Sequence, residues 1–146
     1  MPIKELIFVK DLKEKVLNVL DDSKYGTLAT VKNNKPHSRY MTFHHEGLTM
    51  YTPTDKDTHK TEEIDANPNV HILLGYDGDG LGDAYVEVEG TAAIKDDPEL
   101  KKKIWNKHME KWFKGPDDPD YIVLEIQPTL FRLMNSGSES PQVLEV

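Results

Sequence analysis

Arginine is scarce in this chain, and one of the two arginines lies in a segment with the pattern of a β-strand. In that segment a period of two residues places Arg39, Met41 and Phe43 on one face. A guanidinium between apolar side chains needs an anionic partner, because an unpaired buried charge is costly. The planar guanidinium suits a phosphate group, which it binds through two parallel hydrogen bonds. A salt bridge to one of the 26 carboxylates, or a position at the rim of the sheet, is the alternative.

A second candidate anion site lies where a predicted strand leads into a predicted helix, at residues 51–60. The first turn of a helix presents free N–H groups and the positive end of the helix dipole. Thr58 can donate its hydroxyl there, and Lys56 and Lys60 are one helical turn apart. Asp55 and Asp57 oppose an anion, however, and capping of the helix by Thr58 is the alternative role.

The overall composition limits the classes of function. The chain has 146 residues and 16.7 kDa, as expected for one domain over residues 1–146. Its 18 basic and 26 acidic residues give a net charge of −8, which disfavours binding to a nucleic-acid backbone. Cysteine is absent, which excludes disulfides and thiolate chemistry. No apolar run approaches the roughly 20 residues of a membrane span, and the N-terminus lacks a secretory signal pattern, so we expect a cytoplasmic protein.

The first half of the chain predicts a helix followed by three strands with short connections. Apolar residues recur at helical spacing in residues 11–21. Short β-branched or alternating runs then predict strands at 27–31, 37–45 and 48–52. A short helix is expected over 56–67, before Pro68.

The second half adds further strands and one more helix. Strands are predicted at 70–76 and 84–95, with a loop at 77–83 between them. A helix is expected after Asp97, and Pro98 suits its first position. Strands at 121–126 and 130–134 follow, and 135–146 is expected to be a loose tail. The strands pair at hairpin distance, which predicts a mainly β protein, an antiparallel barrel with peripheral helices, rather than a doubly wound parallel sheet.

An ordered series of short runs resembles the FMN-binding split-barrel family typified by pyridoxamine 5′-phosphate oxidase, and within it the small general stress proteins. The resemblance covers about residues 6–134. The runs that carry it are Gly26–Val31, Pro36–Phe43, Tyr51–Thr52, Thr58–Lys60, Asn67–Val70, Val86–Ala92 and Trp112–Tyr121.

The resemblance implies a homodimer that binds FMN in two equivalent clefts at the subunit interface. Arg39 matches an arginine at the FMN phosphate, and Met41 and Phe43 match residues under the flavin ring. The implied cofactor-binding set includes Tyr40 and Thr42 of the same strand, the pair Tyr51 and Thr52, and Trp112 as an aromatic wall from the partner subunit. Core packing is the alternative role for Trp112. Thr58, His59 and Lys60 fall where the family has a serine–arginine–lysine phosphate clamp.

Two departures from the family pattern bear on function. His59 replaces the arginine of the clamp, and two extra residues separate the clamp from Tyr51 and Thr52. The C-terminus lacks the arginine and histidine residues that bind the vitamin substrate in true pyridoxamine phosphate oxidases, so that activity is not expected. The prediction is an FMN-dependent oxidoreductase linked to the stress response, with no catalytic side chain assigned. A non-catalytic flavin-binding stress protein, or a split barrel that binds heme or a deazaflavin, is the alternative.

The histidines do not predict a metal site. His44 and His45 are adjacent, so on a strand their side chains point to opposite faces. His45 and Glu46 are not followed by the second histidine of a zinc protease motif. No metal is therefore expected.

Overall fold

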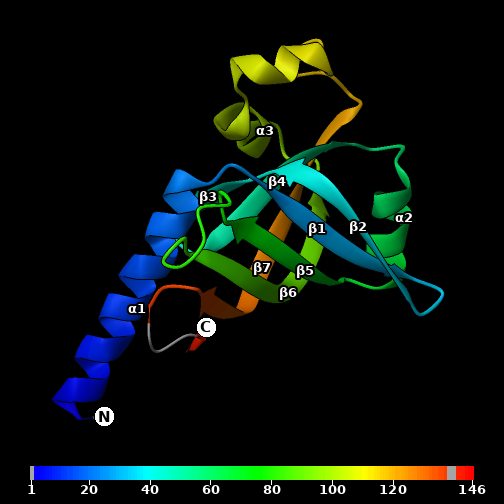
Figure 1. Ribbon diagram of the computed structural model, residues 1–146. Coiled ribbons are helices and arrows are strands. Elements are labelled where there is room, and N and C mark those ends of the chain that lie inside the picture. The colour runs from blue at the N-terminus through cyan, green and yellow to red at the C-terminus, as the bar shows by residue number, and fades with distance from the viewer. Residues whose placement is uncertain (1, 138–140) are drawn as a thin grey trace.

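One antiparallel sheet forms the body of the protein (Figure 1). The structure, a computed structural model, describes residues 2–137 and 141–146. The strands follow the order β2-β1-β5-β6-β7-β4-β3, and β8 pairs with β7. Their bounds are β1 (Tyr25–Lys32), β2 (Lys35–Thr42), β3 (His44–Glu46), β4 (Thr49–Asp55), β5 (Asn69–Gly75), β6 (Tyr85–Lys95), β7 (Tyr121–Met134) and β8 (Gln142–Glu145).

The sheet curls into a barrel that is open along one seam. β2 and β4 approach each other there, although no hydrogen-bonded register joins them within the described residues. The inner face is packed with apolar side chains at alternate positions, among them Leu28, Ile72, Val88, Ile126 and Phe131, each almost fully buried. The predicted mainly β fold, an antiparallel barrel with peripheral helices, is confirmed.

Four helical segments lie around the barrel. They are α1 (Ile3–Asp22), α2 (His59–Ala66), α3 (Pro98–Ile104) and the 3₁₀-helix η1 (Lys107–Lys111). α2 lies at the side of the barrel against β1, while α3 and η1 cover one end of it. Under α3 and η1 a second apolar cluster forms, which fixes η1 and the residues after it to the end of β7. No helix within the described residues is long and apolar enough to cross a membrane.

The helix predicted over 11–21 begins much earlier, at Ile3. Its first turns extend away from the barrel, and Ile3, Leu6 and Phe8 are exposed. Only Leu12, Val16, Val19 and Leu20 are buried, so only this part of the helix shows an apolar stripe. Periodicity therefore detected the buried half of α1 and missed the exposed half.

The strands predicted at 121–126 and 130–134 are one continuous strand, β7. The register between β6 and β7 shifts beside Gly90, which pairs with Pro128. Proline is tolerated in a strand at such a bulge. A Cβ on Gly90 would lie 2.5 Å from the carbonyl oxygen of Gln127, so the close approach of the two backbones requires glycine.

Two further expectations are corrected by the structure. The sequence predicts that the helix after Asp97 continues to Gly115 and Pro116. It ends instead at Ile104, because Trp105 leaves the helical conformation (φ −54°, ψ 134°), and a separate 3₁₀ turn follows. The tail expected to be loose over 135–146 forms a strand at Gln142–Glu145, which pairs with β7 and buries Leu144. Residues 138–140 of that tail lie outside the described residues.

Candidate functional site

Arg39 is held on the inner face of β2 by a set of fixed acceptors. Its Nη1 donates to the carbonyl oxygen of Leu28 at 3.1 Å and to the hydroxyl of Thr30 at 2.8 Å. Its Nη2 lies 3.3 Å from Oε2 of Glu63. β1 and α2 therefore fix the guanidinium from two sides, which reduces the conformational entropy lost when it binds an anion.

Glu63 is the buried counter-ion of this cluster. Its side chain is only 3% exposed, and it reaches β1 and β2 from the second turn of α2. It accepts a hydrogen bond from Thr30 and pairs with Nδ1 of His37 at 3.0 Å. The Thr30 hydrogen bond, assisted by His37 and Arg39, lowers the pKa of Glu63 although burial opposes ionisation. The side chain is thus an anion throughout the neutral pH range.

A cationic pocket of about 410 Å³ opens above this cluster. In a chain of net charge −8, its lining holds three cations, two histidines and one carboxylate. The lining residues are Lys32, His37, Arg39, Thr58, His59, Lys60 and Glu63. The site therefore attracts anions.

The ammonium group of Lys60 is partly buried in this pocket and lacks a hydrogen-bond acceptor in the part of the chain that the structure describes. Burial, together with the nearby charge of Arg39, lowers the pKa of its ammonium group. It makes no hydrogen bond or ion pair with any other described residue. A phosphate between Lys60 and Arg39 would remove the repulsion between the two cations and supply the missing acceptor.

A second hollow, the seam pocket, of about 370 Å³, adjoins the cationic pocket. Thr58 and Lys60 line both, so the two hollows lie side by side and share these side chains; together they form the joined site. The seam pocket is more apolar, and its other lining residues are Tyr40, Met41, Thr42, Pro53, Thr54, Asp55, Met109, Trp112 and Phe113.

The walls of the seam pocket include strand edges without a neighbouring strand. β2 is the last strand of its end of the sheet and pairs only with β1 within the described residues. β3 covers β4 only at Thr49–Tyr51, which leaves the edge from Thr52 to Asp55 unpaired by any described strand. Such edges present N–H and C=O groups, and at Pro53 of β4 only the carbonyl oxygen is offered. A planar heterocycle with donors and acceptors along its rim could bind to them.

Most of the residues predicted from the sequence come together at this joined site. Arg39, Thr58, His59 and Lys60 line the cationic pocket. Tyr40, Met41, Thr42 and Trp112 line the seam pocket. Trp112 is 68% exposed, which excludes the core-packing alternative, and it lines the pocket of its own chain, whereas the sequence led us to expect it from a partner.

Three predicted residues line neither pocket. Phe43 and Thr52 are buried in the main core, and Tyr51 packs against the cluster beneath α3 and η1. The hydroxyl of Thr52 has no hydrogen-bond partner among the described residues, yet its side chain is fully buried. A role for these residues at a cofactor would have to be indirect or through the backbone, and it stays a prediction. The hydroxyl of Thr58 donates to the carbonyl oxygen of Asp55 and does not cap α2.

Sequence reasoning missed Lys32, His37 and Glu63. His37 precedes Arg39 by two residues, so the strand period that selected Met41 and Phe43 also selects His37. Glu63 follows Lys60 by three residues and therefore lies on the same side of α2. The structure shows no cluster of three or more metal-ligating side chains in residues 2–137 and 141–146.

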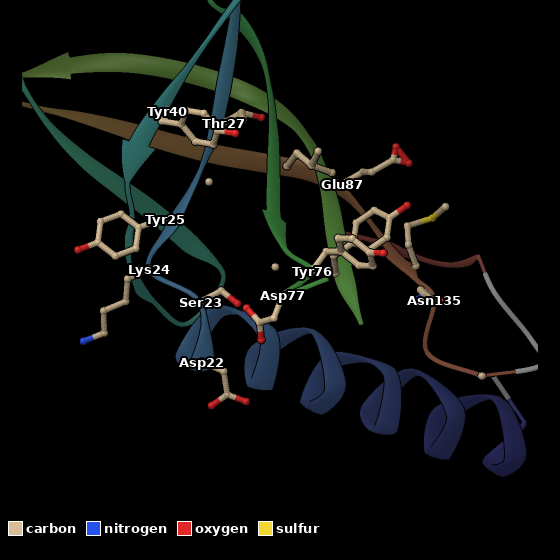
Figure 2. Close-up of a pocket in the computed structure, with 16 residues that line it drawn as sticks. Asp22, Ser23, Lys24, Tyr25, Thr27, Tyr40, Tyr76, Asp77, Glu87 and Asn135 are labelled. Carbon is tan, nitrogen blue, oxygen red and sulfur yellow. The ribbon is translucent and has the colours of Figure 1, made fainter. Parts of the chain in front are cut away.

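A third and larger hollow, the tyrosine groove, of about 1120 Å³, lies on the outer face of the sheet (Figure 2). Figure 2 shows Tyr25 and Tyr40 on one side of it and Tyr76 on the other, with Asp22 and Ser23 at the end of α1 below. Tyr25 is 73% and Tyr40 84% exposed. Tyr40 also lines the seam pocket, so the groove and the candidate ligand site share a wall.

The fold and the joined pockets fit one class of protein, and comparison with known proteins agrees. Residues 12–135 match the pyridoxamine 5′-phosphate oxidase family, so the chain belongs to that family and its fold is the split barrel. It is 62% identical over 137 residues to General stress protein 26 of Bacillus subtilis strain 168, a match that covers 94% of this chain and 98% of the relative.

Solved structures place the chain in the same fold. The crystal structure of General Stress Protein 26 from Bacillus anthracis strain Sterne is 39% identical, with a TM-score of 0.83 over 92% of this chain and 98% of that one. A heme binding protein from Mycobacterium smegmatis has a TM-score of 0.75 at 17% identity over 91% of this chain and 57% of that one. At that identity the likeness concerns the fold alone.

Proposed function

We propose that this protein binds FMN at the joined pockets and acts as a flavin-dependent oxidoreductase linked to the stress response. The observation that carries the proposal is the junction of two unlike hollows at Thr58 and Lys60. One hollow has the charge of a phosphate site, and the other has the apolar walls and free strand edges that suit a flat ring. A cytoplasmic location, expected from the sequence, is part of this proposal.

The residues present fit each part of FMN. Arg39 and Lys60 would hold the phosphate, since both are cationic and Lys60 lacks an acceptor. The edges of β2 and β4 would hydrogen-bond the rim of the isoalloxazine, and Trp112 would cover it and exclude water. Bound FMN would supply the electron transfer, while the protein supplies position and electrostatics. No side chain of the site is assigned as a general acid or base.

We further propose that two copies of the chain form a dimer through the tyrosine groove. An exposed patch of tyrosines is typical of the centre of a protein interface, where aromatic side chains contribute most of the binding energy. A second copy is the occupant we favour, because Tyr40 joins the groove to the seam pocket. A partner bound there would close one wall of the ligand site, as the expected interface location of the cofactor requires.

The visible absorption spectrum of the purified protein, before and after addition of FMN, tests the cofactor. Flavin absorption bands that stay with the protein through gel filtration are expected. A Soret band would identify the cofactor as heme, and bands at the shorter wavelengths of a deazaflavin would identify that cofactor. A colourless protein that binds none of the added ligands would contradict the proposal.

Addition of NADH or NADPH without oxygen then tests catalysis. Loss of the flavin bands, and their return when air is admitted, is expected of an oxidoreductase. Flavin that stays oxidised with both nucleotides, but is reduced by dithionite, would instead favour a non-catalytic flavin-binding protein.

A further inference from the structure

His37 lies in the cationic pocket, and neither its residue type nor the family resemblance assigned it a role there. It is exposed by 45% at the mouth of the pocket, on the same face of β2 as Arg39. Its Nδ1 is 3.0 Å from Oε1 of Glu63. Its Nε2 has no partner among the described residues, so this nitrogen is the one available to a ligand.

The contact with Glu63 fixes which tautomer the neutral ring adopts. A carboxylate can only accept a hydrogen bond, so Nδ1 carries the hydrogen. The neutral ring then presents the lone pair of Nε2, which repels an anionic oxygen. Only the protonated ring presents an N–H at that position. Binding of an anion by His37 therefore needs a proton.

The other charges of the pocket make proton uptake depend on the ligand. Lys32 of β1, Arg39 of β2, and His59 and Lys60 of α2 line the same pocket, and all of them are cations or can become cations. A dianionic phosphate in this pocket attracts a further positive charge directly, and Glu63, which its neighbours keep ionised, supports the imidazolium from beneath.

We propose that His37, oriented by Glu63, is an additional phosphate ligand that becomes protonated when the anion binds. This inference rests on the proposed function, since it assigns a role within the same site. Its consequence is that ligand affinity rises as the pH falls through the range in which histidines titrate, near pH 6.5. Linkage limits the rise to a factor of about ten for each pH unit and each proton taken up.

Isothermal titration calorimetry with FMN at pH 7.5, repeated in two buffers of different ionisation enthalpy, measures the protons taken up. We expect the wild type to take up between ~0.3 and 1 proton more per FMN than His37→Gln. Glutamine keeps an N–H for Glu63 but does not titrate in this range. Equal uptake by the wild type and His37→Gln would overturn the inference while FMN binding itself stands.

Two further variants locate the proton. His59→Gln alters a histidine of the same pocket whose side chain makes no hydrogen bond or ion pair with Glu63. His71→Gln alters a histidine on β5 outside the pocket. His71→Gln should keep the uptake seen in the wild type, and His59→Gln shows how much of it belongs to the second histidine of the pocket. Loss of the uptake in His59→Gln, with retention in His37→Gln, would assign the proton to His59 and contradict the proposal.

Sulfate separates this inference from the proposed cofactor. Sulfate stays a dianion between pH 5.5 and 8, so any proton taken up with it comes to the protein. The NMR signals of the histidine rings, followed against pH with and without sulfate, should show His37 titrating at higher pH when sulfate is present. If the protein shows this shift with sulfate but fails to bind FMN, the proposal that His37 binds an anion stands and only the FMN proposal is overturned. An unchanged His37 titration with sulfate would overturn the anion role.

Discussion

The two faces of the β1–β2 strand pair contrast sharply in how their polar groups are used. On the inner face Arg39, Thr30 and Glu63 bond to one another, and the cluster lies beneath a cationic pocket. On the outer face Tyr25 and Tyr40 project into an open groove, and neither side chain makes a hydrogen bond with a described residue. Because neighbouring residues of a strand point to opposite faces, one strand serves a small anion on one side and a large surface on the other. A substitution on the inner face should therefore weaken ligand binding and leave the dimer intact, whereas a substitution on the outer face acts on the dimer.

The largest expected effect concerns the outer face. Tyr25→Asp places a charge in the proposed dimer interface and removes an aromatic contact. We expect the dissociation constant of the dimer to rise by about 30- to 1000-fold, as for other central interface residues. Light scattering at several protein concentrations measures this change.

The matched control for the interface is Leu81→Asp, in the loop between β5 and β6. Leu81 is almost fully exposed and does not line the groove. It should leave the dimer unchanged. A Tyr25→Asp protein that stays dimeric at the lowest measurable concentration would move the interface away from the groove.

The next effect concerns the inner face. Arg39→Ala should weaken FMN binding by about 10- to 100-fold, because each hydrogen bond from a charged donor contributes about 1.5–3 kcal/mol. Fluorescence quenching of FMN measures the affinity. Light scattering should show the same dimer as in the wild type.

The second arginine of the chain supplies the control for this change. Arg132 pairs with Glu89 on the outer face of the sheet and lines none of the pockets described above. Arg132→Ala should bind FMN as the wild type does. Equal loss of affinity in both variants would mean that Arg39 acts through stability and not through the ligand.

A smaller effect concerns the buried acid that supports the inner face. Folding lowers the pKa of Glu63 below its ordinary value of 4.5. The ionised form of Glu63 therefore stabilises the folded protein above about pH 4.5. This contribution is lost as the pH falls through the lowered pKa. Glu63→Gln should therefore cost about 1–2 kcal/mol at pH 7 and less at pH 3.5.

Urea unfolding at the two pH values tests the role of Glu63. Asp118→Asn is a useful control, because the pKa of Asp118 is also lowered but through backbone hydrogen bonds at the surface, mainly that of Lys114. A difference between wild type and Glu63→Gln that is the same at both pH values would show that the charge of Glu63 plays no part in stability.

The smallest effect concerns Lys60. Burial and the nearness of Arg39 lower the pKa of its ammonium group, so its charged form is disfavoured in the folded protein without ligand. Lys60→Gln should raise Tm by about 1–3 °C while it weakens FMN binding, since functional sites often lower stability. Calorimetry without FMN tests the change in Tm, and calorimetry with FMN tests the weaker binding. A Tm below that of the wild type, measured without ligand, would contradict the expected stabilisation.

Local patterns in the sequence predicted the parts of the fold that bury one face. The strand alternation in β6 and the buried half of α1 were found because their apolar residues face the core. The start of α1 was missed, because its apolar residues are exposed and follow no stripe. β7 was divided at Pro128, because the bulge that accommodates this proline depends on Gly90 of another strand.

The residues of the candidate site also divide into those that a local pattern predicted and those that it missed. Arg39 was predicted because an arginine is unusual between apolar strand residues. Lys60 was predicted because it lies one helical turn from Lys56 at the start of a predicted helix and matches the family's phosphate clamp. Glu63 was missed, since only the packing of α2 on β1 brings its carboxylate to Thr30 and Arg39. Partners that lie 24 or 33 residues apart leave no local pattern.

The separation of β4 and β7 along the sequence has a consequence for how the protein is made. β7 pairs with β6, β4 and β8, and among the described strands it alone links β4 and β3 to the rest of the sheet. A ribosome must therefore synthesise β5, β6 and the helices after them before β4 can pair with β7. Until then the nascent chain exposes apolar strands, and a helper protein that shields them during synthesis would raise the yield of native molecules.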